Sequence, residues 1–320
     1  MVVSNVITIM IKHPFQKREM PPLCLALGFF DGVHKGHKAV ISKAKEEAEQ
    51  RNLKSGVMTF FPHPKEVLRK ETKVDYLTSM EEKEQLMKEL GIDYLFVVHF
   101  DLSFSELNPQ QFVDQYLIQL NVKHVVAGFD YTYGRLGKGT METLPFHSRN
   151  KLTYTTVDKV ESDGNKISST NIRQALGKGD ISVANKYLGR TYESSGIVVN
   201  GDKRGRTIGF PTANVQVGER AFIPNTGVYI VRIMVNNKWY NGVCNIGFKP
   251  TFHDTLHKPT IEVHIFRFDK NIYGEHVKVQ WHRKIRNEMK FASVDELVSQ
   301  LQLDVTEAEV YFQVKNEIKP

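Results

Sequence analysis

The sequence predicts two domains of different class: an N-terminal α/β domain with a parallel sheet, and a mainly antiparallel β-barrel C-terminal domain with a terminal helix. Its 320 residues suggest about two domains of roughly 150 residues each. Strand-like apolar runs alternate with helical patterns from residue 23 to about 160, which is typical of a parallel sheet covered by helices. After residue 190, strand-like runs follow one another directly until a helical pattern ends the chain, which is typical of a barrel.

In the N-terminal half, the apolar runs expected to form strands are residues 23–27, 55–60, 94–98 and 123–127. Apolar residues at helical spacing predict helices over 37–50, 79–90 and 109–120. Ligands of such sheets bind at the carboxyl ends of the strands. The turn at residues 28–37 lies at one such end.

In the C-terminal half, the expected strands are residues 196–200, 228–235, 238–245, 260–268 and 277–281. Asn236-Asn237 is a tight hairpin signal, and helical periodicity returns from Val294 toward Phe312. Two short helical stretches over 171–189, broken at 177–180, are expected to join the halves. The predicted domains are residues 1–187 and 188–320.

Composition favours a cytoplasmic protein that binds small anionic molecules. Its contents of 41% hydrophobic and 25% charged residues are ordinary for a globular protein, and no apolar run is long enough to cross a bilayer. The net charge of +7 is divided into +3 for residues 1–187 and +4 for the remainder, without a basic run. Nucleic acid and membrane are therefore not expected partners. Cys24 and Cys244 are expected to be buried thiols in a reducing cytoplasm.

The stretch GFFDGVHKGH, residues 28–37, joins a predicted strand to a predicted helix. Unpaired N–H groups at a helix start favour an anion, often a phosphate. The glycine spacing fits neither of the familiar phosphate loops. His34 and His37 surround Gly36, which allows both imidazoles to face a ligand. In the alternative reading, one histidine caps the helix and the other is solvated.

Three further stretches carry polar chemistry. KISSTNIR, residues 166–173, offers hydroxyls and an arginine at a predicted helix start, either as a helix cap or as a phosphate clamp. AGFDYTYGRLGKG, residues 127–139, follows a predicted strand and ends in a glycine-rich basic loop. GDKRGRTIGFPTAN, residues 201–214, is glycine-rich and basic without the spacing of a Walker loop.

Together and in this order, these motifs resemble those of the bacterial bifunctional riboflavin kinase/FAD synthetases, along nearly the whole chain. The N-terminal half is similar to the Rossmann-like sheet of the nucleotidylyl transferases through H-x-G-H at 34–37 and S-S-T-x-x-R at 168–173. The C-terminal half resembles the riboflavin kinase barrel through G-F-P-T-A-N at 209–214, Gly227-Val228-Tyr229, Asn245-Ile246-Gly247, and the strand around Glu262.

The resemblance implies that ATP phosphorylates riboflavin to FMN, and that FMN then attacks a second ATP to give FAD and pyrophosphate. His34 and His37 are the implied catalytic residues of the second reaction. The implied ATP and phosphate ligands are Gly28, Phe30, Asp31, Gly36, Ser168, Ser169, Thr170 and Arg173. His63, Asp130 and Thr132 are implied to hold FMN or the nucleotide, although His63 is equally consistent with a satisfied loop histidine.

For the kinase reaction, the resemblance points to Glu262 as a general base, because a neutral alcohol loses a proton as it attacks. Strand alternation places Glu262 and His264 on one face and the aliphatic residues 261, 263 and 265 on the other. A solvated face is the alternative for Glu262. Thr212 and Asn214 are oxygen ligands suited to Mg²⁺. The implied ATP phosphate ligands are Gly201, Lys203, Gly205 and Arg206.

Two other functions are considered. An adenylyltransferase with another acceptor would share the N-terminal motifs, but residues 191–320 argue against it. A non-catalytic flavin sensor or an RNA-binding regulator could use the barrel, but both sets of catalytic residues are present, and no interleaving of aromatic and basic residues favours RNA. The expected partners are the small-molecule substrates ATP, riboflavin and FMN, with no obligate protein partner.

Overall fold

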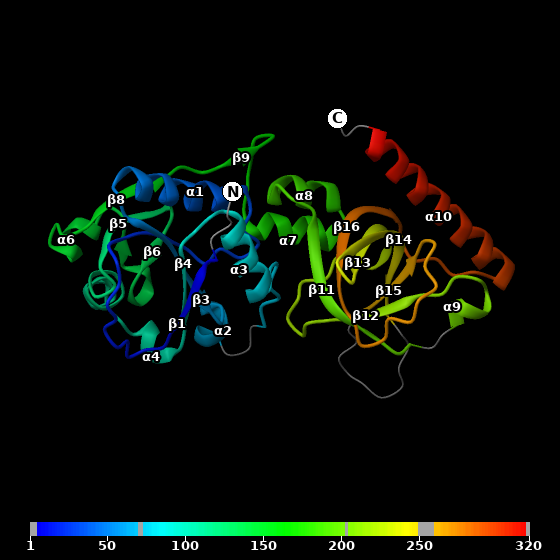
Figure 1. Ribbon diagram of the computed structural model, residues 1–320, viewed down its shortest axis with the longest axis horizontal. Helices are drawn as coiled ribbons and strands as arrows, with labels where there is room; N and C mark the ends of the chain where they lie inside the picture. Colours follow the sequence, from blue (N-terminus) through cyan, green and yellow to red (C-terminus); the bar gives the residue numbers. More distant parts are fainter. Residues whose placement is uncertain (1–4, 70–72, 202–203, 249–258, 318–320) are drawn as a thin grey trace. The chain divides into compact units, whose positions relative to one another are not determined.

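The computed structural model describes residues 5–69, 73–201, 204–248 and 259–317, and the chain divides into two compact units, residues 1–169 and 170–320 (Figure 1). This division falls at the start of α7 (Ser169–Lys178). The boundary predicted from the motifs, between residues 187 and 188, stays a prediction. Among the described residues, no helix has both the length and the apolar character needed to span a bilayer.

The first unit contains the predicted parallel sheet, with the strand order β1-β4-β3-β2-β5-β8. The four predicted strands are confirmed, and β1 and β8, which were not predicted, complete the sheet at its two edges. The strands are β1 (Ile7–Ile11), β2 (Leu23–Leu27), β3 (Lys54–Phe61), β4 (Tyr94–His99), β5 (Val122–Gly128) and β8 (Thr153–Val157).

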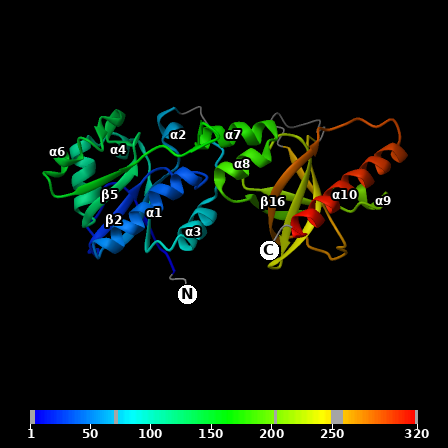
Figure 2. The same ribbon diagram turned by 90° about the horizontal axis from the view of Figure 1, so that it is seen from above.

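Helices cover both faces of this sheet, each over its own hydrophobic core. One face packs against α1 (Lys35–Gln50) and α3 (Met80–Glu89), the predicted helices that follow β2 and β3 (Figure 2). The opposite face packs against α4 (Leu102–Ser105), α5 (Pro109–Phe112) and a π-helix (Val113–Ile118). The helix predicted over 109–120 is therefore present, but it is α-helical only in its first turn.

Short elements complete the first unit. They are α2 (Pro64–Leu68), β6 (Thr132–Tyr133), a 3₁₀ turn (Arg135–Gly137), β7 (Gly139–Thr140), α6 (Leu144–Ser148), β9 (Glu161–Ser162) and β10 (Asn165–Lys166).

The order of the strands indicates where a ligand is expected in this sheet. The chain runs from β2 outward through β3 and β4 on one side, and continues through β5 and β8 on the other. The pair β2 and β5 is therefore the point at which the winding direction reverses. In open α/β sheets, ligands bind beyond the carboxyl ends of the strands at this point. The turn at residues 28–37 follows β2 there.

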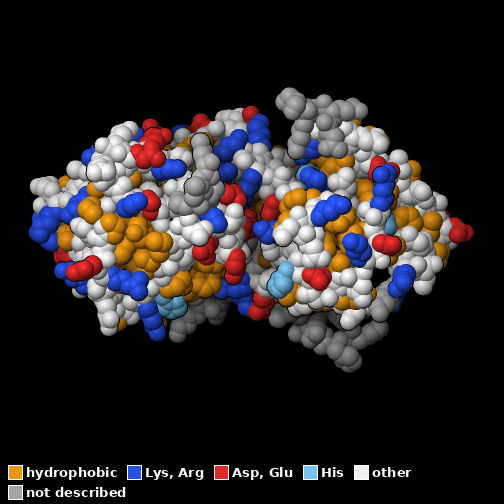
Figure 3. Space-filling view, viewed as in Figure 1, with side chains coloured by type: hydrophobic (Ala, Val, Ile, Leu, Met, Phe, Trp, Pro, Cys, Tyr) orange, Lys and Arg blue, Asp and Glu red, His pale blue; other side chains and the backbone are white. Residues whose placement is uncertain are grey.

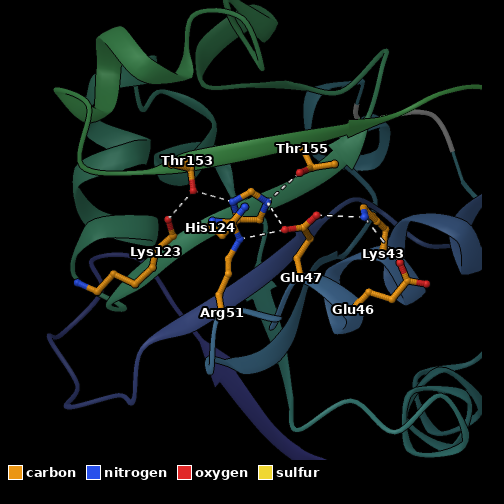
Figure 4. Close-up of polar contacts among 8 residues, drawn as sticks. All are labelled: Lys43, Glu46, Glu47, Arg51, Lys123, His124, Thr153 and Thr155. Atoms are coloured by element: carbon orange, nitrogen blue, oxygen red, sulfur yellow. Dashed lines mark hydrogen bonds and ion pairs between the residues drawn. The ribbon is translucent and has the colours of Figure 1, made fainter. Parts of the chain in front are cut away.

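A buried polar network connects α1 to β5 and β8 (Figure 4). His124 of β5 is 1% exposed, and its ring nitrogens lie 2.7 Å and 2.9 Å from the hydroxyl oxygens of Thr153 and Thr155 of β8. Glu47 of α1 lies 3.8 Å from His124 and also pairs with Arg51 at 2.9 Å. Burial lowers the pKa of His124 to about 4. A neutral ring therefore links α1 to β5 and β8 at neutral pH.

The second unit begins with the two short helices predicted before the barrel, α7 and α8 (Ile181–Leu188). The barrel is closed and antiparallel, in the order β11-β12-β15-β14-β13-β16. Its strands are β11 (Tyr192–Val199), β12 (Ala213–Val217), β13 (Gly227–Val235), β14 (Lys238–Gly247), β15 (Thr260–Ile265) and β16 (His276–Arg286). A short helix, α9 (Arg204–Thr207), precedes β12, and α10 (Val294–Glu317) ends the chain as predicted.

The tight hairpin between β13 and β14 was predicted from the sequence, whereas the strand β12 was not. Asn236 and Asn237 have φ of 48° and 61°, as the predicted tight hairpin between β13 and β14 requires. The strand β12 was not predicted, because its first residues belong to the P-T-A-N motif, which contains poor strand formers. Pairing with β11 and β15 makes this segment a strand. On the visible face of the molecule, basic and acidic side chains are interspersed (Figure 3).

Candidate active sites

The turn after β2 stacks its two histidines at the start of α1. His34 is the N-cap residue, and its Nδ1 accepts a hydrogen bond from the backbone N–H of His37 at 3.2 Å. The two rings stack with centroids 3.6 Å apart, and the ring of Phe30 meets His37 edge-on at 5.3 Å. Burial, followed by the charges of His34 and Lys83, holds the pKa of His37 well below its ordinary value. His34 therefore caps α1, as the alternative reading expected of one histidine, whereas His37 is half-buried and not solvated; the role of the two histidines as ligands stays a prediction.

The backbone of this turn adopts an uncommon conformation. Phe30 and Val33 have φ of 51° and 39°, in the left-handed region that side chains other than glycine seldom adopt. A Cβ atom on Gly28 would lie 2.7 Å from the Phe30 ring, so this close approach requires glycine at that position. Such strain is common at ligand-binding turns, where surrounding contacts hold it.

Asp31 supports the turn from below. It is 1% exposed, and its carboxylate accepts hydrogen bonds from the backbone N–H of Leu77 at 3.0 Å and of Thr78 at 3.3 Å. The Thr78 hydroxyl in turn accepts from the N–H of Gly32 at 3.1 Å. The carboxylate therefore ties the turn to the segment before α3.

The turn and the S-S-T segment meet, although 138 positions separate them. The hydroxyl of Ser169 donates to the backbone carbonyl of Asp31 at 2.8 Å. The carbonyl of Ile167 lies 3.8 Å from the position of a Cβ on Gly36. Ser168 is half-buried beside them in sequence, whereas Thr170 and Arg173 belong to α7 in the second unit. The structure thus brings the H-x-G-H turn and the beginning of the predicted clamp together.

His63 caps α2 and packs against the turn. Its Nδ1 accepts a hydrogen bond from the backbone N–H of Lys65 at 3.0 Å, and its ring lies edge-on to Phe29 at 4.3 Å. The backbone N–H of His63 donates to the hydroxyl of Tyr76 at 2.8 Å. His63 therefore has hydrogen-bond partners of its own, as a satisfied loop histidine would, and it lies next to the turn.

Asp130 and Thr132 lie beyond the end of β5, the other strand at the reversal point. Asp130 is exposed and pairs with Lys166 at 2.8 Å, so it contacts the segment that leads into the S-S-T motif. Thr132 is exposed on the two-residue strand β6. These residues occupy the strand-end region expected of ligand-binding groups.

Sequence reasoning missed Lys83, a charged residue on the buried side of α3. Lys83 is 3% exposed and shares the inward face of this helix with Leu86 and Met87. Its ammonium donates to the carbonyl of Phe29 and to the hydroxyl of Thr59, both at 3.1 Å. The available signal was a lysine at an inward position of an otherwise apolar helical stripe.

The second unit contains a cavity of about 370 Å³ on the outer wall of the barrel, beneath α9 and α10. It combines apolar side chains with several polar groups, as small-molecule sites do. The α9 side contributes Arg204, Gly205, Ile208, Phe210 and Thr212; the strands contribute Val228, Val243, Cys244, Asn245, Glu262 and His264; the remaining lining residues are Arg286, Glu288, Met289, Phe291, Leu297, Leu301 and Asp304.

Three polar residues lie side by side across neighbouring strands of this wall. Glu262 of β15 is paired in register with Asn214 of β12 on one side and Asn245 of β14 on the other. Glu262 and His264 share a half-exposed face, whereas the aliphatic residues between them are buried, as the alternation predicted. The carboxylate thus lies between two amide side chains and lines the cavity.

Two of the predicted phosphate-binding residues, Gly201 and Gly205, lie close to the same end of β12. A Cβ on Gly201 would overlap the amide of Asn214, so only glycine allows the chain this approach. Gly205 and the exposed Arg206 belong to α9, and Thr212 lines the cavity. Lys203 lies outside the described residues.

Sequence reasoning also missed the wall that α10 and the preceding loop add to the cavity. Arg286 makes hydrogen bonds of 2.9 Å and 2.7 Å to Asp304, which is 1% exposed. Leu297 and Leu301 provide apolar surface. Their spacing predicted a helix only, and nothing in that spacing separates a core position from a ligand pocket.

Comparisons with known proteins match both halves of the chain. A family model described as FAD synthetase matches residues 16–171, and one described as riboflavin kinase matches residues 188–312. A bifunctional riboflavin kinase/FMN adenylyltransferase of Bacillus subtilis is 49% identical, over 95% of this chain and 98% of that protein. The Escherichia coli K12 protein of the same description is 38% identical, over 94% and 96%.

One solved structure is similar over nearly the full length. It is a crystal structure from Streptococcus pneumoniae, titled a macrolide-efflux protein, with a TM-score of 0.87 and 38% identity. The match covers 95% of this chain and 99% of that chain.

Proposed function

The chain belongs to the bifunctional riboflavin kinase/FMN adenylyltransferase family, and from this membership we propose how its side chains divide two reactions. The protein phosphorylates riboflavin to FMN and joins FMN to an adenylyl group to give FAD. ATP, riboflavin and FMN are its small-molecule substrates. The match to the riboflavin kinase model argues against an adenylyltransferase with another acceptor. The matches to both enzyme models argue against a non-catalytic sensor.

We propose that adenylyl transfer takes place at the turn between β2 and α1. The phosphate of FMN attacks the α-phosphorus of ATP, and pyrophosphate leaves. This nucleophile is already an anion, so the site aligns two anions and stabilises the charge that develops between them. The observation that supports this most is the stacked histidine pair at the reversal point of the sheet, in which burial holds the pKa of His37 well below its ordinary value.

The tautomer of His34 follows from its hydrogen bond. Because Nδ1 accepts from the backbone N–H of His37, the proton of the neutral ring resides on Nε2, which can donate to a phosphate oxygen. His37, whose pKa is lowered by burial, is the second histidine that contacts the phosphates. Gly28, Phe30, Asp31 and Gly36 shape the turn around ATP, with Asp31 acting through residues 77 and 78. Ser168, Ser169, Thr170 and Arg173 clamp the leaving pyrophosphate, and His63, Asp130 and Thr132 hold FMN or the nucleotide.

We propose that riboflavin is phosphorylated in the barrel cavity. Its 5′-hydroxyl loses a proton as it attacks the γ-phosphorus of ATP, Glu262 accepts that proton as the general base, and ADP leaves as the bond between the γ-phosphorus and the bridging oxygen breaks. The cavity supports this role because it places the carboxylate among apolar walls suited to a planar ring system. Gly201, Lys203, Gly205 and Arg206 hold the ATP phosphates.

Mg²⁺ is the proposed metal of the kinase site. Thr212 and Asn214 offer neutral oxygen ligands on the wall that carries Glu262, which fits the oxygen preference of this ion. When bound, Mg²⁺ neutralises charge on the transferring phosphate. The side chains of Thr212 and Asn214 would orient it toward ATP, and Gly201 leaves room for the Asn214 amide.

We also propose that residues 1–187 and 188–320 are the two functional domains and that both reactions occur in the cytoplasm. The cytoplasm is supported by Cys24 and Cys244, which are free and buried. The whole assignment is tested by incubating the protein with riboflavin, ATP and MgCl₂ and separating the flavins by chromatography. FMN and FAD should both appear. Formation of neither would contradict the assignment, and FMN alone would contradict the adenylyl site.

A further inference from the structure

Lys83 and Thr59 converge on the backbone carbonyl of Phe29, the second residue of the turn between β2 and α1. The Nζ of Lys83 donates to the carbonyl oxygen of Phe29 at 3.1 Å and to the hydroxyl of Thr59 at 3.1 Å. Thr59, which is fully buried on β3, donates its own hydroxyl hydrogen to the same carbonyl at 2.7 Å. One carbonyl of the turn is therefore held from both α3 and β3.

The ammonium of Lys83 is retained in the interior without a direct carboxylate partner. Within the part of the chain that the structure describes, no carboxylate oxygen lies within 4.0 Å of its nitrogen, although the charge of Asp31 acts on it from nearby. Burying a charge that lacks an ion-pair partner is unfavourable for folding. Stability alone therefore gives little reason for a lysine here, and its position points to the site.

Contacts of Phe29 extend the reach of Lys83 to both substrates of adenylyl transfer. Nζ lies 5.2 Å from the centroid of the Phe29 ring, on a cation–π contact. The same ring packs against His63 at 4.3 Å. Its backbone leads directly into Phe30, whose ring contacts His37. The side chain behind the turn is thus one contact away from the proposed ATP side and the proposed FMN side.

We propose that Lys83 is a positioning residue for adenylyl transfer, holding Phe29 so that the turn presents His34 and His37 to the triphosphate and His63 to FMN. This inference rests on the function proposed for the turn. Lys83 itself touches no reacting atom. It acts by fixing the carbonyl and the ring of Phe29.

The main test replaces the ammonium and compares two lysines of one helix pair. Lys83→Met keeps the length of the side chain and removes both hydrogen bonds to the turn region. Lys45→Met is the matched control, because Lys45 of α1 also donates to a carbonyl of the α3 region, that of Leu90 at 3.3 Å, at the opposite end of α3. FMN adenylylation and riboflavin phosphorylation are measured on each full-length variant.

Lys83→Met is expected to lower kcat for adenylylation by about 10- to 100-fold with KM for ATP changed much less, because misplaced reactants bind but do not align. Riboflavin phosphorylation and the Lys45→Met enzyme should stay within about twofold of wild type. An unchanged kcat, or an equal loss in Lys45→Met, would overturn the proposal. If Lys83→Met does not fold, Thr59→Val, which removes the shared hydroxyl, should lower the same kcat severalfold, and no change would again overturn it.

The pH profile separates positioning by the charge from simple packing. Burial, opposed by Asp31, lowers the pKa of Lys83 to about 8. The titratable groups that face it are Asp31 on the turn and His37 on α1, and β3 adds the uncharged Thr59. Adenylylation by the wild-type enzyme should fall as pH rises through about 8, and Lys83→Arg should abolish that fall. A fall that persists in Lys83→Arg would contradict the proposal.

His37→Ala is assayed in parallel to separate this inference from the function on which it rests. If His37→Ala retains normal adenylylation, the proposed site at the turn is wrong. If His37→Ala loses adenylylation and Lys83→Met does not, the site stands and the positioning role of Lys83 is wrong.

Discussion

The two proposed sites use ATP in opposite surroundings. The turn in the first unit presents imidazoles and backbone groups, with its buried carboxylate, Asp31, turned toward the supporting segment. The barrel cavity instead places the carboxylate of Glu262 on its wall. The difference follows from the nucleophiles, because the phosphate of FMN attacks as an anion, whereas the hydroxyl of riboflavin must lose a proton. A base is expected only where there is a proton to remove.

Removal of the base should separate the two sites most strongly. Glu262→Gln keeps the shape of the side chain, and riboflavin phosphorylation should fall by roughly 10²- to 10⁴-fold. Adenylylation of supplied FMN should be nearly unchanged, because that reaction has no alcohol to deprotonate. Both rates are followed by chromatography of the flavins. Glu193→Gln, at a barrel carboxylate bonded to Gln280, is the control and should retain both activities. Loss of both reactions in Glu262→Gln would break the comparison.

The reciprocal change is made at the turn. His37→Ala should lower FMN adenylylation by about 10²- to 10³-fold through loss of one preorganised partner of the phosphates. The same enzyme should still convert riboflavin to FMN, which then accumulates. The kinase reaction serves as an internal control for folding. Equal loss of both reactions in a folded variant would show that the sites are not independent.

The third test concerns the proposed metal ligands. Side-chain ligands for Mg²⁺ are expected only at the barrel site. Asn214→Ala or Thr212→Val should lower riboflavin phosphorylation by about 10²-fold and increase the Mg²⁺ concentration needed for half-maximal rate. Gln216→Ala changes the next outward-facing residue of β12 and should have little effect. Normal turnover by Asn214→Ala at limiting Mg²⁺ would show that these residues only shape the P-T-A-N segment and do not bind the ion.

Each unit contains a buried histidine that makes its stability sensitive to acid. Burial lowers the pKa of His124 in the first unit to about 4 and that of His282 in the barrel to about 3, from an ordinary 6.5. Because the unfolded chain binds a proton first, stability is complete above pH 6.5 and falls as pH drops through the window down to these values. For His124 the loss should reach about 3 kcal/mol.

Urea unfolding at several pH values measures this loss. The only tryptophans, Trp239 and Trp281, lie in the barrel, so their fluorescence reports the second unit, whereas circular dichroism reports both. His124→Gln should flatten the pH dependence of the free energy of unfolding of the first unit. The pH dependence of the fluorescence transition, which reports the second unit, should not change. An unchanged pH slope for the first unit would contradict the neutral state of His124.

The smallest effect is expected when the barrel domain is isolated. Residues 188–320 contain Glu262 and all the residues of the proposed kinase site, so this fragment should fold and phosphorylate riboflavin within about threefold of the full chain. Circular dichroism and flavin chromatography test this. A folded fragment without kinase activity would show that residues 1–187 contribute to the kinase reaction.

The fold could be predicted largely from periodicity, because the strands of each core repeat apolar residues at short, regular intervals. The exceptions are instructive. The edge strands β1 and β8 carry half-exposed residues, and β12 begins within the P-T-A-N motif, so tertiary pairing rather than local propensity makes these segments strands.

The sites were predicted less completely than the fold. His34, His37 and Glu262 belong to short motifs and could be singled out. Lys83 could not, because its meaning depends on the carbonyl of Phe29, which is 54 positions away in sequence. The α10 wall of the cavity has the same origin, since residues such as Leu301 approach Glu262 only after the barrel has closed.

The hydrogen bond between His34 and the N–H of His37 has a consequence for reading diverged copies of this protein. The ring nitrogen that orients His34 toward phosphate also caps α1, and loss of such a cap costs a helix about 1 kcal/mol. A copy that had lost its catalytic activity would therefore still be under pressure to keep this residue in order to fold. His37, whose Nδ1 has no hydrogen-bond partner within the described chain, carries no such second duty. Its replacement is the earlier sign of a decayed gene product.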